Sequence, residues 1–232
     1  CISGEGELTF LELLRHLSTQ SPELNSIQGL SFRNADSESF TVNDKREPFK
    51  SLLEIPSPFL SGVVDDEVLF RNKVEANLET QRGCTLRCSY CVYHKDMSKI
   101  SYNSVDRTMD EMRYVINKGV KNIRFVDANF SSKLDHAKQV MRGIIENKFE
   151  TKLMFELIPG FIDEELAQLF AEFNNLNEWN EVTLGVGVQT INIEALHTIR
   201  RAIKLDKFEK TFDLLKKYKF YAKIDLIIGL PG

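Results

Sequence analysis

The chain has 232 residues, of which 42% are hydrophobic and 28% are charged, and its formal net charge is -4. Such a length predicts one sizeable core, or one domain with part of a neighbour. The acidic balance argues against a broad nucleic-acid-binding surface, and neither a run of about 18 apolar residues nor a signal-peptide pattern is present.

The first twenty residues predict a turn followed by a helix. Gly4-Glu5-Gly6-Glu7 precedes leucines at positions 8, 11, 14 and 17, which recur near the helical period. Two glycines before a helix occur in phosphate-binding turns, but a lone G-x-G also fits an ordinary strand-to-helix turn. Both interpretations stay open on the residues alone. Because the chain begins at Cys1, we expect it to be a piece of a longer protein.

Residues 21–73 predict a connector. Breaker residues recur at Ser21-Pro22, Pro48 and Ile55-Pro56-Ser57-Pro58, without sustained hydrophobic periodicity. Within this stretch, residues 27–33 and 39–43 predict a short hairpin. The proline-rich end has the composition of a stiff linker.

Three of the four cysteines, Cys84, Cys88 and Cys91, lie within eight residues in a C-x3-C-x2-C spacing. Cysteine thiolates ligate iron–sulfur clusters, and this spacing lets one loop hold three irons of a [4Fe–4S] cube while the fourth stays open. A zinc site completed by His94 is an alternative, although structural zinc sites usually divide their ligands between two separated pairs. A disulfide is another, but three neighbouring cysteines cannot all pair internally.

Residues 74–232 predict an α/β domain. Strand-like runs at 76–80, 123–126, 153–158, 182–188 and 224–228 alternate with amphipathic helices, which predicts a parallel sheet with covering helices. Ser104 is expected to cap the first of these helices, Gly119 to end it, and a later helix to start near Asp163. Periodicity does not separate a barrel from a doubly wound sheet. Five strands are visible, so a sixth βα unit is expected to lie beyond the chain.

Polar residues lie within these strands or just after them. In parallel β/α folds, ligands bind at the C-terminal ends of the strands. Asp127 follows the second strand, Glu156 lies in the third and Asp225 in the fifth. Glu156 and Asp225 read as carboxylates in buried strands, which is costly unless they are paired or face a ligand. For Asp127 the alternative is an N-cap of the next helix, and for Glu156 a structural ion pair.

The cysteine spacing, with Tyr90 before the last cysteine, resembles the signature loop of the radical S-adenosylmethionine (radical SAM) superfamily. Residues 185–190 and 225–232 are similar to the fourth and fifth strands of the oxygen-independent coproporphyrinogen oxidase and MiaB-like group. The resemblance implies a partial (β/α)6 TIM-type barrel and a [4Fe–4S] cluster whose open iron binds SAM. One electron then cleaves SAM to methionine and a 5′-deoxyadenosyl radical, which abstracts hydrogen from a substrate.

The resemblance also implies which residues contact SAM. Arg201 would pair with the methionyl carboxylate, because a guanidinium fork suits a carboxylate, while Glu156 and Gln189 would contact the ribose. Asp127 stands where the family usually has Gly-Gly-Glu at the SAM amino group, so this chain departs from the pattern there. The full implied set is Tyr90, Asp127, Glu156, Gln189, Arg201, Asp225 and Ile227. No catalytic residue is predicted outside the cysteine loop.

Two N-terminal features are similar to the B12-dependent branch of the superfamily. The Gly-Glu-Gly-Glu turn with its helix resembles the end of a cobalamin-binding domain, and Ile55-Pro56-Ser57-Pro58 resembles the linker that follows it. This implies a domain remnant at 1–20, a linker at 21–73 and a C-terminally truncated core at 74–232. No D-x-H-x-x-G cobalamin motif is present.

The expected function is therefore a radical SAM enzyme, specifically a cobalamin-dependent C-methyltransferase that binds cobalamin in the full-length protein. Peptide epimerisation, cyclisation and methylthiolation are alternative outcomes, and a non-catalytic iron–sulfur electron carrier is the contrasting class. The expected partners are a small-molecule or peptide substrate and an electron donor such as flavodoxin or ferredoxin. Closely spaced free thiols favour the cytoplasm. Arg82 and Arg87 read as surface arginines that offset an anionic cluster.

Overall fold

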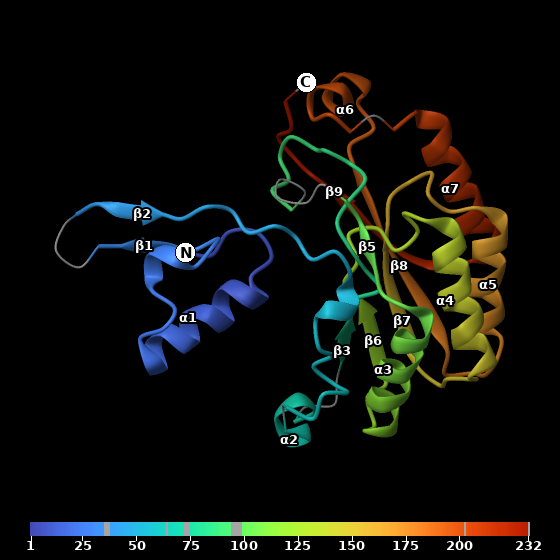
Figure 1. Cartoon of the computed structure of the whole chain (residues 1–232). Coiled ribbons are helices and arrows are strands. Elements are labelled where there is room, and N and C mark those ends of the chain that lie inside the picture. The colour runs from blue at the N-terminus through green and yellow to red at the C-terminus, as the bar shows by residue number, and fades with distance from the viewer. Residues whose placement is uncertain (35–37, 64, 72–74, 94–98, 202, 232) are drawn as a thin grey trace.

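The computed structural model describes residues 1–34, 38–63, 65–71, 75–93, 99–201 and 203–231. Figure 1 shows an N-terminal segment standing beside a larger α/β core. The N-terminal segment contains α1 (Glu7–Thr19), β1 (Ser31–Arg33) and β2 (Phe40–Val42). The core contains β3 (Ala76–Leu78), β4 (Gln81–Arg82), β5 (Ser101–Tyr102), α3 (Val105–Asn117), β6 (Asn122–Phe125), α4 (Leu134–Glu146), β7 (Lys152–Leu157), α5 (Glu164–Asn174), β8 (Glu181–Gln189), α6 (Ile193–Thr198), α7 (Leu205–Tyr218) and β9 (Tyr221–Leu226). A short helix, α2 (Asp66–Leu69), precedes the core.

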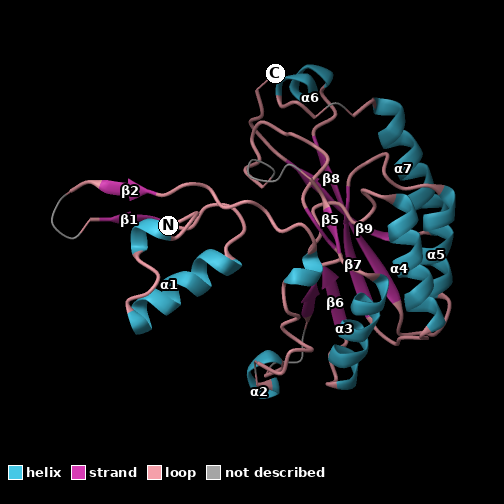
Figure 2. Ribbon diagram, in the orientation of Figure 1, coloured by secondary structure: helices cyan, strands magenta, loops and turns pink. Residues whose placement is uncertain are grey.

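The described core is built on a five-stranded parallel sheet in the order β3-β6-β7-β8-β9. Each strand lies beside the sheet strand that precedes it in the chain, as in a partial TIM-type barrel. Figure 2 shows α3, α4, α5 and α7 on one side of these strands. The predicted fold class is confirmed, although the last strand, expected at 224–228, begins earlier, at Tyr221.

Alternation along the strands decides which side chains reach the helices. On β7, Leu153, Phe155 and Leu157 are buried in the core, whereas Met154 and Glu156 lie on the opposite face. The core includes a group of aromatic rings, with Phe155 stacked on Phe125 at a centroid distance of 4.7 Å. The helix-facing side of the sheet is therefore apolar, and its other side is free to carry polar groups.

Helix boundaries follow the predicted capping residues. The Ser104 hydroxyl accepts a hydrogen bond from the Arg107 backbone N–H at the start of α3, and the Asp163 carboxylate accepts one from the Leu166 N–H at the start of α5. Gly119 follows α3 with φ of 90°, the left-handed conformation that favours glycine after a helix. The helix and hairpin predictions for the N-terminal part are also confirmed, because α1 forms and β1 pairs antiparallel with β2.

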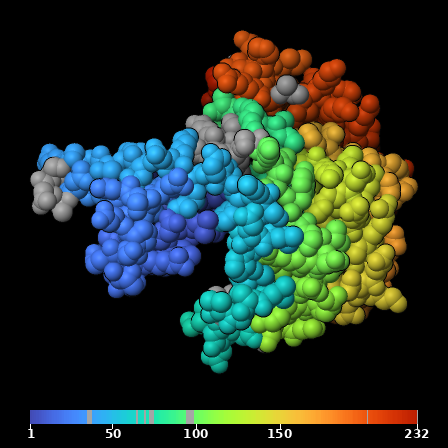
Figure 3. Space-filling model, viewed as in Figure 1, coloured from blue at the N-terminus to red at the C-terminus, as the bar shows by residue number. Residues whose placement is uncertain are grey.

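The N-terminal segment has little core of its own. Leu11, Leu14 and Leu17 on α1 are exposed, and the buried residue of that helix is Thr9, whose hydroxyl donates to the Gln28 carbonyl. An ion pair between Arg46 and Glu12 ties α1 to the chain that follows the hairpin. Figure 3 shows this segment projecting from the core. The predicted division at residues 20 and 73 stays a prediction, and residue 73 lies outside the described residues.

Across the part of the chain that the structure describes, no helix combines the length and the apolar character needed to cross a membrane.

Candidate functional site

A cavity of about 370 Å³ opens at the C-terminal ends of the core strands. Strands β6, β7, β8 and β9, or the turns just after them, each contribute to its wall, together with the loop between β4 and β5. The lining residues are Cys84, Leu86, Cys88, Tyr90, Cys91, Tyr93, Val126, Asp127, Ala128, Glu156, Leu157, Ile158, Gly187, Gln189, Arg201 and Asp225. One cavity thus collects all the predicted site residues except Ile227.

The three cysteines lie on one loop as free thiols. Cys88 is buried, while Cys84 and Cys91 are half-buried, and the Cys91 N–H donates to the Cys88 carbonyl at 3.1 Å, which turns the chain between the two thiols. Burial raises the pKa of Cys84, and the neighbouring Cys88 and Cys91 raise it further, because thiolates close together repel one another. The disulfide alternative is wrong for these residues.

The thiol arrangement also bears on the kind of metal group that fits. Among the described residues, no three His, Cys, Asp or Glu side chains converge on a point suited to a single metal ion. A cubane cluster needs no such point, because each cysteine binds a different iron. His94, the fourth ligand of the zinc alternative, lies outside the described residues.

Arg201 reaches the cysteine loop from the turn after α6. Its Nη1 lies 3.4 Å from the Cys88 sulfur, and its Nη2 donates to the Gly187 carbonyl. The side chain is 4% exposed, and within the described chain its Nε finds no hydrogen-bond partner. An unpaired buried donor is costly, so this guanidinium is suited to an anion that enters the cavity.

Tyr90 lies on the same loop and is partly exposed. Burial raises the pKa of its hydroxyl to about 12, although the Arg201 cation acts in the opposite direction. Tyr90 therefore presents a neutral phenol to the cavity at neutral pH.

Asp127 is buried just after β6 and binds the chain where β3 leads into β4. Its carboxylate accepts hydrogen bonds from the Thr80 N–H at 2.8 Å, the Gln81 N–H at 2.9 Å and the Thr80 hydroxyl at 2.6 Å. Burial raises its pKa to about 7, against the effect of these donors. The N-cap alternative is wrong, because α4 begins at Leu134 with Lys133 in the capping position.

Glu156 projects from β7 on the face away from the helices. Its Oε1 accepts a hydrogen bond from Arg124 Nη2 at 2.8 Å, so the predicted alternative of an ion pair is present. Both side chains keep partial exposure, 41% for Arg124 and 27% for Glu156, which leaves the carboxylate accessible from the cavity. Arg124 was not singled out from the sequence, because it pairs in register with Met154 and reaches Glu156 two residues further along β7.

Two glycines of β8 make room for the site side chains. A Cβ on Gly185 would lie 2.3 Å from Glu156 Oε2, and one on Gly187 would lie 2.9 Å from Gln189 Nε2. The space that these glycines leave is occupied by neighbouring side chains. Gln189 has a φ of 67°, at an irregularity in the pairing of β8 with β9.

Of the two site residues predicted at the end of the chain, Asp225 lines the cavity and Ile227 does not. Asp225 lines the cavity but is exposed, so the expectation of a buried strand carboxylate is wrong. Ile227 lies outside the cavity lining, and its backbone N–H donates to the Gln189 carbonyl at 2.9 Å. Direct contact between SAM and any residue of the predicted set stays a prediction.

Several residues near the site carried no sequence signal or a misleading one. Tyr93 lines the cavity, and its hydroxyl accepts from the Gly83 N–H at 3.3 Å. Arg82 is not a surface arginine, since its side chain is 16% exposed and pairs with three glutamates. His136 of α4 is buried against the Tyr102 ring.

Comparison with known proteins gives relatives along the whole chain. The chain is 26% identical over 238 residues to the cobalamin-dependent radical SAM methyltransferase TokK of Streptomyces tokunonensis, covering 98% of this chain and 34% of TokK. Among solved structures, the radical SAM methyltransferase TsrM of Kitasatospora setae, with tryptophan and a SAM analogue bound, matches 100% of this chain and 46% of its own. That match has a TM-score of 0.75 at 21% identity.

A second solved structure agrees in fold. The cobalamin-dependent enzyme OxsB, with aqua-cobalamin and SAM bound, matches 97% of this chain and 32% of its own, with a TM-score of 0.75 at 18% identity. The chain thus spans between about a third and a half of the length of these proteins. The model of the radical SAM superfamily matches residues 78–232, which include the cysteine loop and every strand that walls the cavity. This chain belongs to the radical SAM superfamily.

Proposed function

We propose that this chain is the radical-forming part of a cobalamin-dependent radical SAM C-methyltransferase. The observation that carries the proposal is the single cavity of about 370 Å³ that brings three free thiols together with Glu156, Gln189 and Arg201. A simple electron carrier has no use for ligand-facing groups around its cluster. The presence of these groups supports an enzyme.

In this proposal Cys84, Cys88 and Cys91 hold a [4Fe–4S] cluster, and SAM occupies the remainder of the cavity. The donor set fits, because the thiols share one loop and the cavity is enclosed by strand ends. The bound cluster would supply one electron, which cleaves SAM and yields a radical for hydrogen abstraction, and cobalamin would carry the methyl group.

The chain's own residues orient and shield the reactants. The unpaired Nε of Arg201 is available to a carboxylate, and its other nitrogens are fixed by Gly187 and Cys88. Arg124 holds the Glu156 carboxylate toward the cavity, where it can accept hydrogen bonds from ribose hydroxyls. The apolar wall, which includes Leu157 and Ile158, limits access of water to a reactive species.

The methyltransferase outcome rests on likeness in the N-terminal part. TokK matches across 98% of the chain, and thus includes the N-terminal segment as well as the core. We infer that α1 and the hairpin adjoin a cobalamin-binding domain in the full-length protein, that an external flavodoxin or ferredoxin supplies the electron, and that the substrate is a small molecule or peptide. Purification of the full-length protein with bound cobalamin would support this outcome, and its absence would favour methylthiolation, epimerisation or cyclisation.

The radical SAM step can be tested on the chain itself. Anaerobic reconstitution with iron and sulfide should give about four irons per chain, and dithionite with SAM should release 5′-deoxyadenosine. Cys88→Ala should lose both properties, whereas Cys1→Ala, which removes the exposed cysteine far from the cavity, should keep them. One bound zinc per chain, or a cluster that leaves SAM intact, would contradict the proposal.

A further inference from the structure

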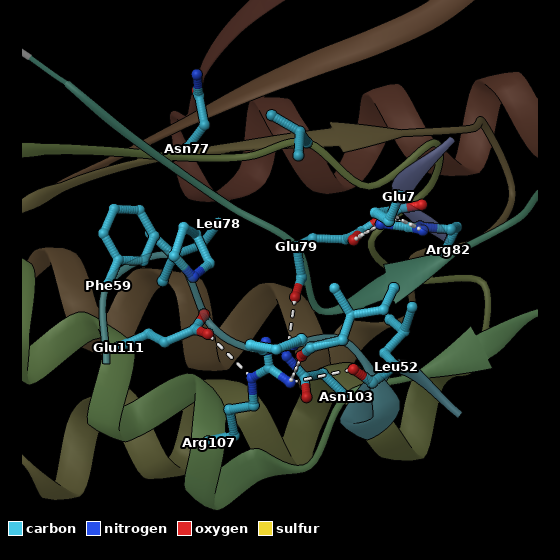
Figure 4. Close-up of a pocket in the computed structure, with 14 residues that line it drawn as sticks. Glu7, Leu52, Phe59, Asn77, Leu78, Glu79, Arg82, Asn103, Arg107 and Glu111 are labelled. Carbon is cyan, nitrogen blue, oxygen red and sulfur yellow. Dashed lines mark hydrogen bonds and ion pairs between the residues drawn. The ribbon is translucent and has the colours of Figure 1, made fainter. Parts of the chain in front are cut away.

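Arg82 lies two residues before Cys84, at the point where the core meets the N-terminal segment. Its guanidinium contacts carboxylates on both sides of that junction (Figure 4). Nε and Nη2 donate to the two oxygens of Glu79 at 2.9 and 2.8 Å, which makes a bidentate pair within the core. Nη1 donates at 2.7 Å to Glu7, the first residue of α1, and at 3.1 Å to Glu5 in the turn before it.

These contacts are partly desolvated. The side chain of Arg82 is 16% exposed and that of Glu5 is 8% exposed. Exposed ion pairs usually contribute 0 to about 1 kcal/mol, but charge-assisted forks with restricted solvent are stronger and fix direction as well as distance. Burial acts to lower the pKa of Arg82, but the paired Glu79 and Glu7 together raise it, so Arg82 stays a cation at all working pH values.

The N-terminal side of the junction is held at a second point. The other oxygen of Glu5 accepts a hydrogen bond from the Phe49 N–H at 2.6 Å, so the turn and the linker move together. On the core side, Arg107 of α3 donates to the Leu52 carbonyl at 3.0 Å and the Ile55 carbonyl at 2.8 Å. Figure 4 shows Arg107 held by Glu111 on the same helix.

Between Arg82 and Arg107 lies a cavity of about 330 Å³, walled by the linker, β3 and the start of α3. Val126 lines this cavity and also the cysteine cavity. The junction and the site are therefore neighbours that share a wall. A displacement at the junction can therefore alter the wall of the cysteine cavity at Val126.

Arg82 is also rigidly connected to the cysteine loop. It pairs with Ser101 in the ladder between β4 and β5, which closes the loop at its base. The next residue, Gly83, has a φ of 112° and packs so closely that a Cβ would lie 2.9 Å from the Lys99 carbonyl oxygen. A displacement of Arg82 is therefore transmitted to Cys84 through a single residue, Gly83, which is closely packed against Lys99.

We propose that Arg82 is a positioning residue that couples the placement of the Glu5–Glu7 turn to the geometry of the cysteine loop. The carboxylates of Glu5 and Glu7 act from 77 and 75 positions earlier in the chain. The coupling sets how firmly the loop is held, and, where the proposed cluster is bound, the environment of the cluster. The effect on the cluster rests on the proposed function, whereas the effect on the loop does not.

The test replaces the N-terminal carboxylates and leaves the core unchanged. Hydrogen–deuterium exchange is measured on the wild-type chain, on Glu5→Gln/Glu7→Gln, and on Glu12→Gln as the matched control. Glu12 lies in the same segment and pairs with Arg46, within the N-terminal segment. We expect amides of residues 83–93 to exchange about tenfold faster in the double variant, corresponding to about 1.4 kcal/mol, and to be unchanged in the control.

A second readout uses the reconstituted, dithionite-reduced chain. The double variant should keep about four irons but show altered g-values in its EPR spectrum, and Arg82→Lys should lie between wild type and Arg82→Gln, since lysine keeps the charge without the fork. The proposal is overturned if faster exchange in the double variant is confined to residues 1–56, or if Glu12→Gln loosens the loop equally. The exchange result does not depend on a cluster, so it separates this failure from failure of the proposed function.

Discussion

Side chains at the site occupy space that is open because two neighbouring residues, Gly185 and Gly187, have no Cβ. Gly185 faces Glu156 across the paired strands β7 and β8, and Gly187 lies under Gln189 and Arg201. Glycine in a strand interior weakens the strand, so its presence here indicates a required close approach. The required space belongs to charged and amide side chains that line the cavity.

Replacing Gly185 by alanine should displace the Glu156 carboxylate, since the new Cβ would lie 2.3 Å from Oε2 and 2.9 Å from Cδ. Because Glu156 is proposed to contact the ribose, SAM affinity should fall about tenfold, the loss expected for one charge-assisted hydrogen bond. Isothermal titration of the reconstituted chain would measure it.

The matched control for that prediction is Gly143→Ala in α4, where the nearest atom to the new Cβ is the flexible Met109 sulfur at 3.0 Å. It should leave SAM affinity unchanged. Equal affinities for Gly185→Ala and wild type would show that Glu156 takes no part in binding.

Asp127 predicts a pH dependence of stability. Burial raises its folded-state pKa to about 7 from its ordinary value of 3.8, so between these pH values the folded chain holds a proton that the unfolded chain has released. This contribution to the free energy of unfolding therefore falls as pH rises from about 4 to 7, by at most about 1.4 kcal/mol per pH unit.

Urea unfolding at pH 5 and pH 8 would check the prediction. Wild type should lose more stability than Asp127→Asn over this interval, because the amide does not titrate. If the two chains show the same change between pH 5 and pH 8, Asp127 is ionised in the folded protein throughout.

At the scale of elements, the two-residue strands β4 and β5 close the cysteine loop. Gln81 pairs with Tyr102 and Arg82 with Ser101, so the two ends of the cysteine loop lie side by side. The Asn103 N–H donates to the Thr80 carbonyl at 2.8 Å, which adds a backbone hydrogen bond next to the β4–β5 ladder. The ladder is short and depends on close backbone approach at its end.

Gly83→Ala should therefore disturb the loop. The position has a φ of 112°, and the added Cβ would contact the Lys99 oxygen at 2.9 Å. Reconstituted iron should drop well below that of wild type, by at least about half, as measured by iron and sulfide analysis. Gly62→Ala has a positive φ of 67° but no atom within 4 Å of its Cβ, so it tests backbone strain without the clash. Iron contents that match in the two variants would contradict the role of the close approach.

Elements were predictable from sequence where local signals decide them. The side chains of Ser104 and Asp163 accept from backbone N–H groups three residues later, and Gly119 adopts the left-handed conformation itself. The strands carry apolar runs, so the positions of these elements followed from chain-local chemistry. The cysteine loop was equally clear from spacing. Contacts between distant segments were not, because neither Arg82 with Glu5 and Glu7 nor Arg124 with Glu156 has a periodicity that announces it.

At the scale of the whole molecule, the two parts differ in how much apolar surface they bury. Strands β6, β7 and β8 lie between neighbours and under helices, and every core-facing residue of β7 is at most 2% exposed. The N-terminal segment has a two-stranded hairpin and a helix with its leucines exposed. Its attachment relies more on polar contacts.

Native-state hydrogen exchange should therefore resolve two levels of stability. Amides of β7 and β8 should exchange only through global unfolding, whereas those of α1 and β1 should exchange at least about tenfold faster through opening of the N-terminal segment alone. A single free energy for both sets, with the same denaturant dependence, would mean that the chain unfolds as one unit.

The order of the sheet also has a consequence during synthesis. Each sheet strand joins the one made before it, so the core can assemble from its N-terminal side as the chain leaves the ribosome. Cys88 and its buried neighbour Arg201 are separated by 113 residues, which take roughly 10 s to translate at about 5–20 residues per second. The thiols are therefore complete well before β8 and the turn after α6 enclose them. During that interval we expect delivery of iron and sulfide for the proposed cluster to compete with oxidation of the uncovered cysteines, so that oxygen exposure during expression lowers the fraction of chains that receive the cluster.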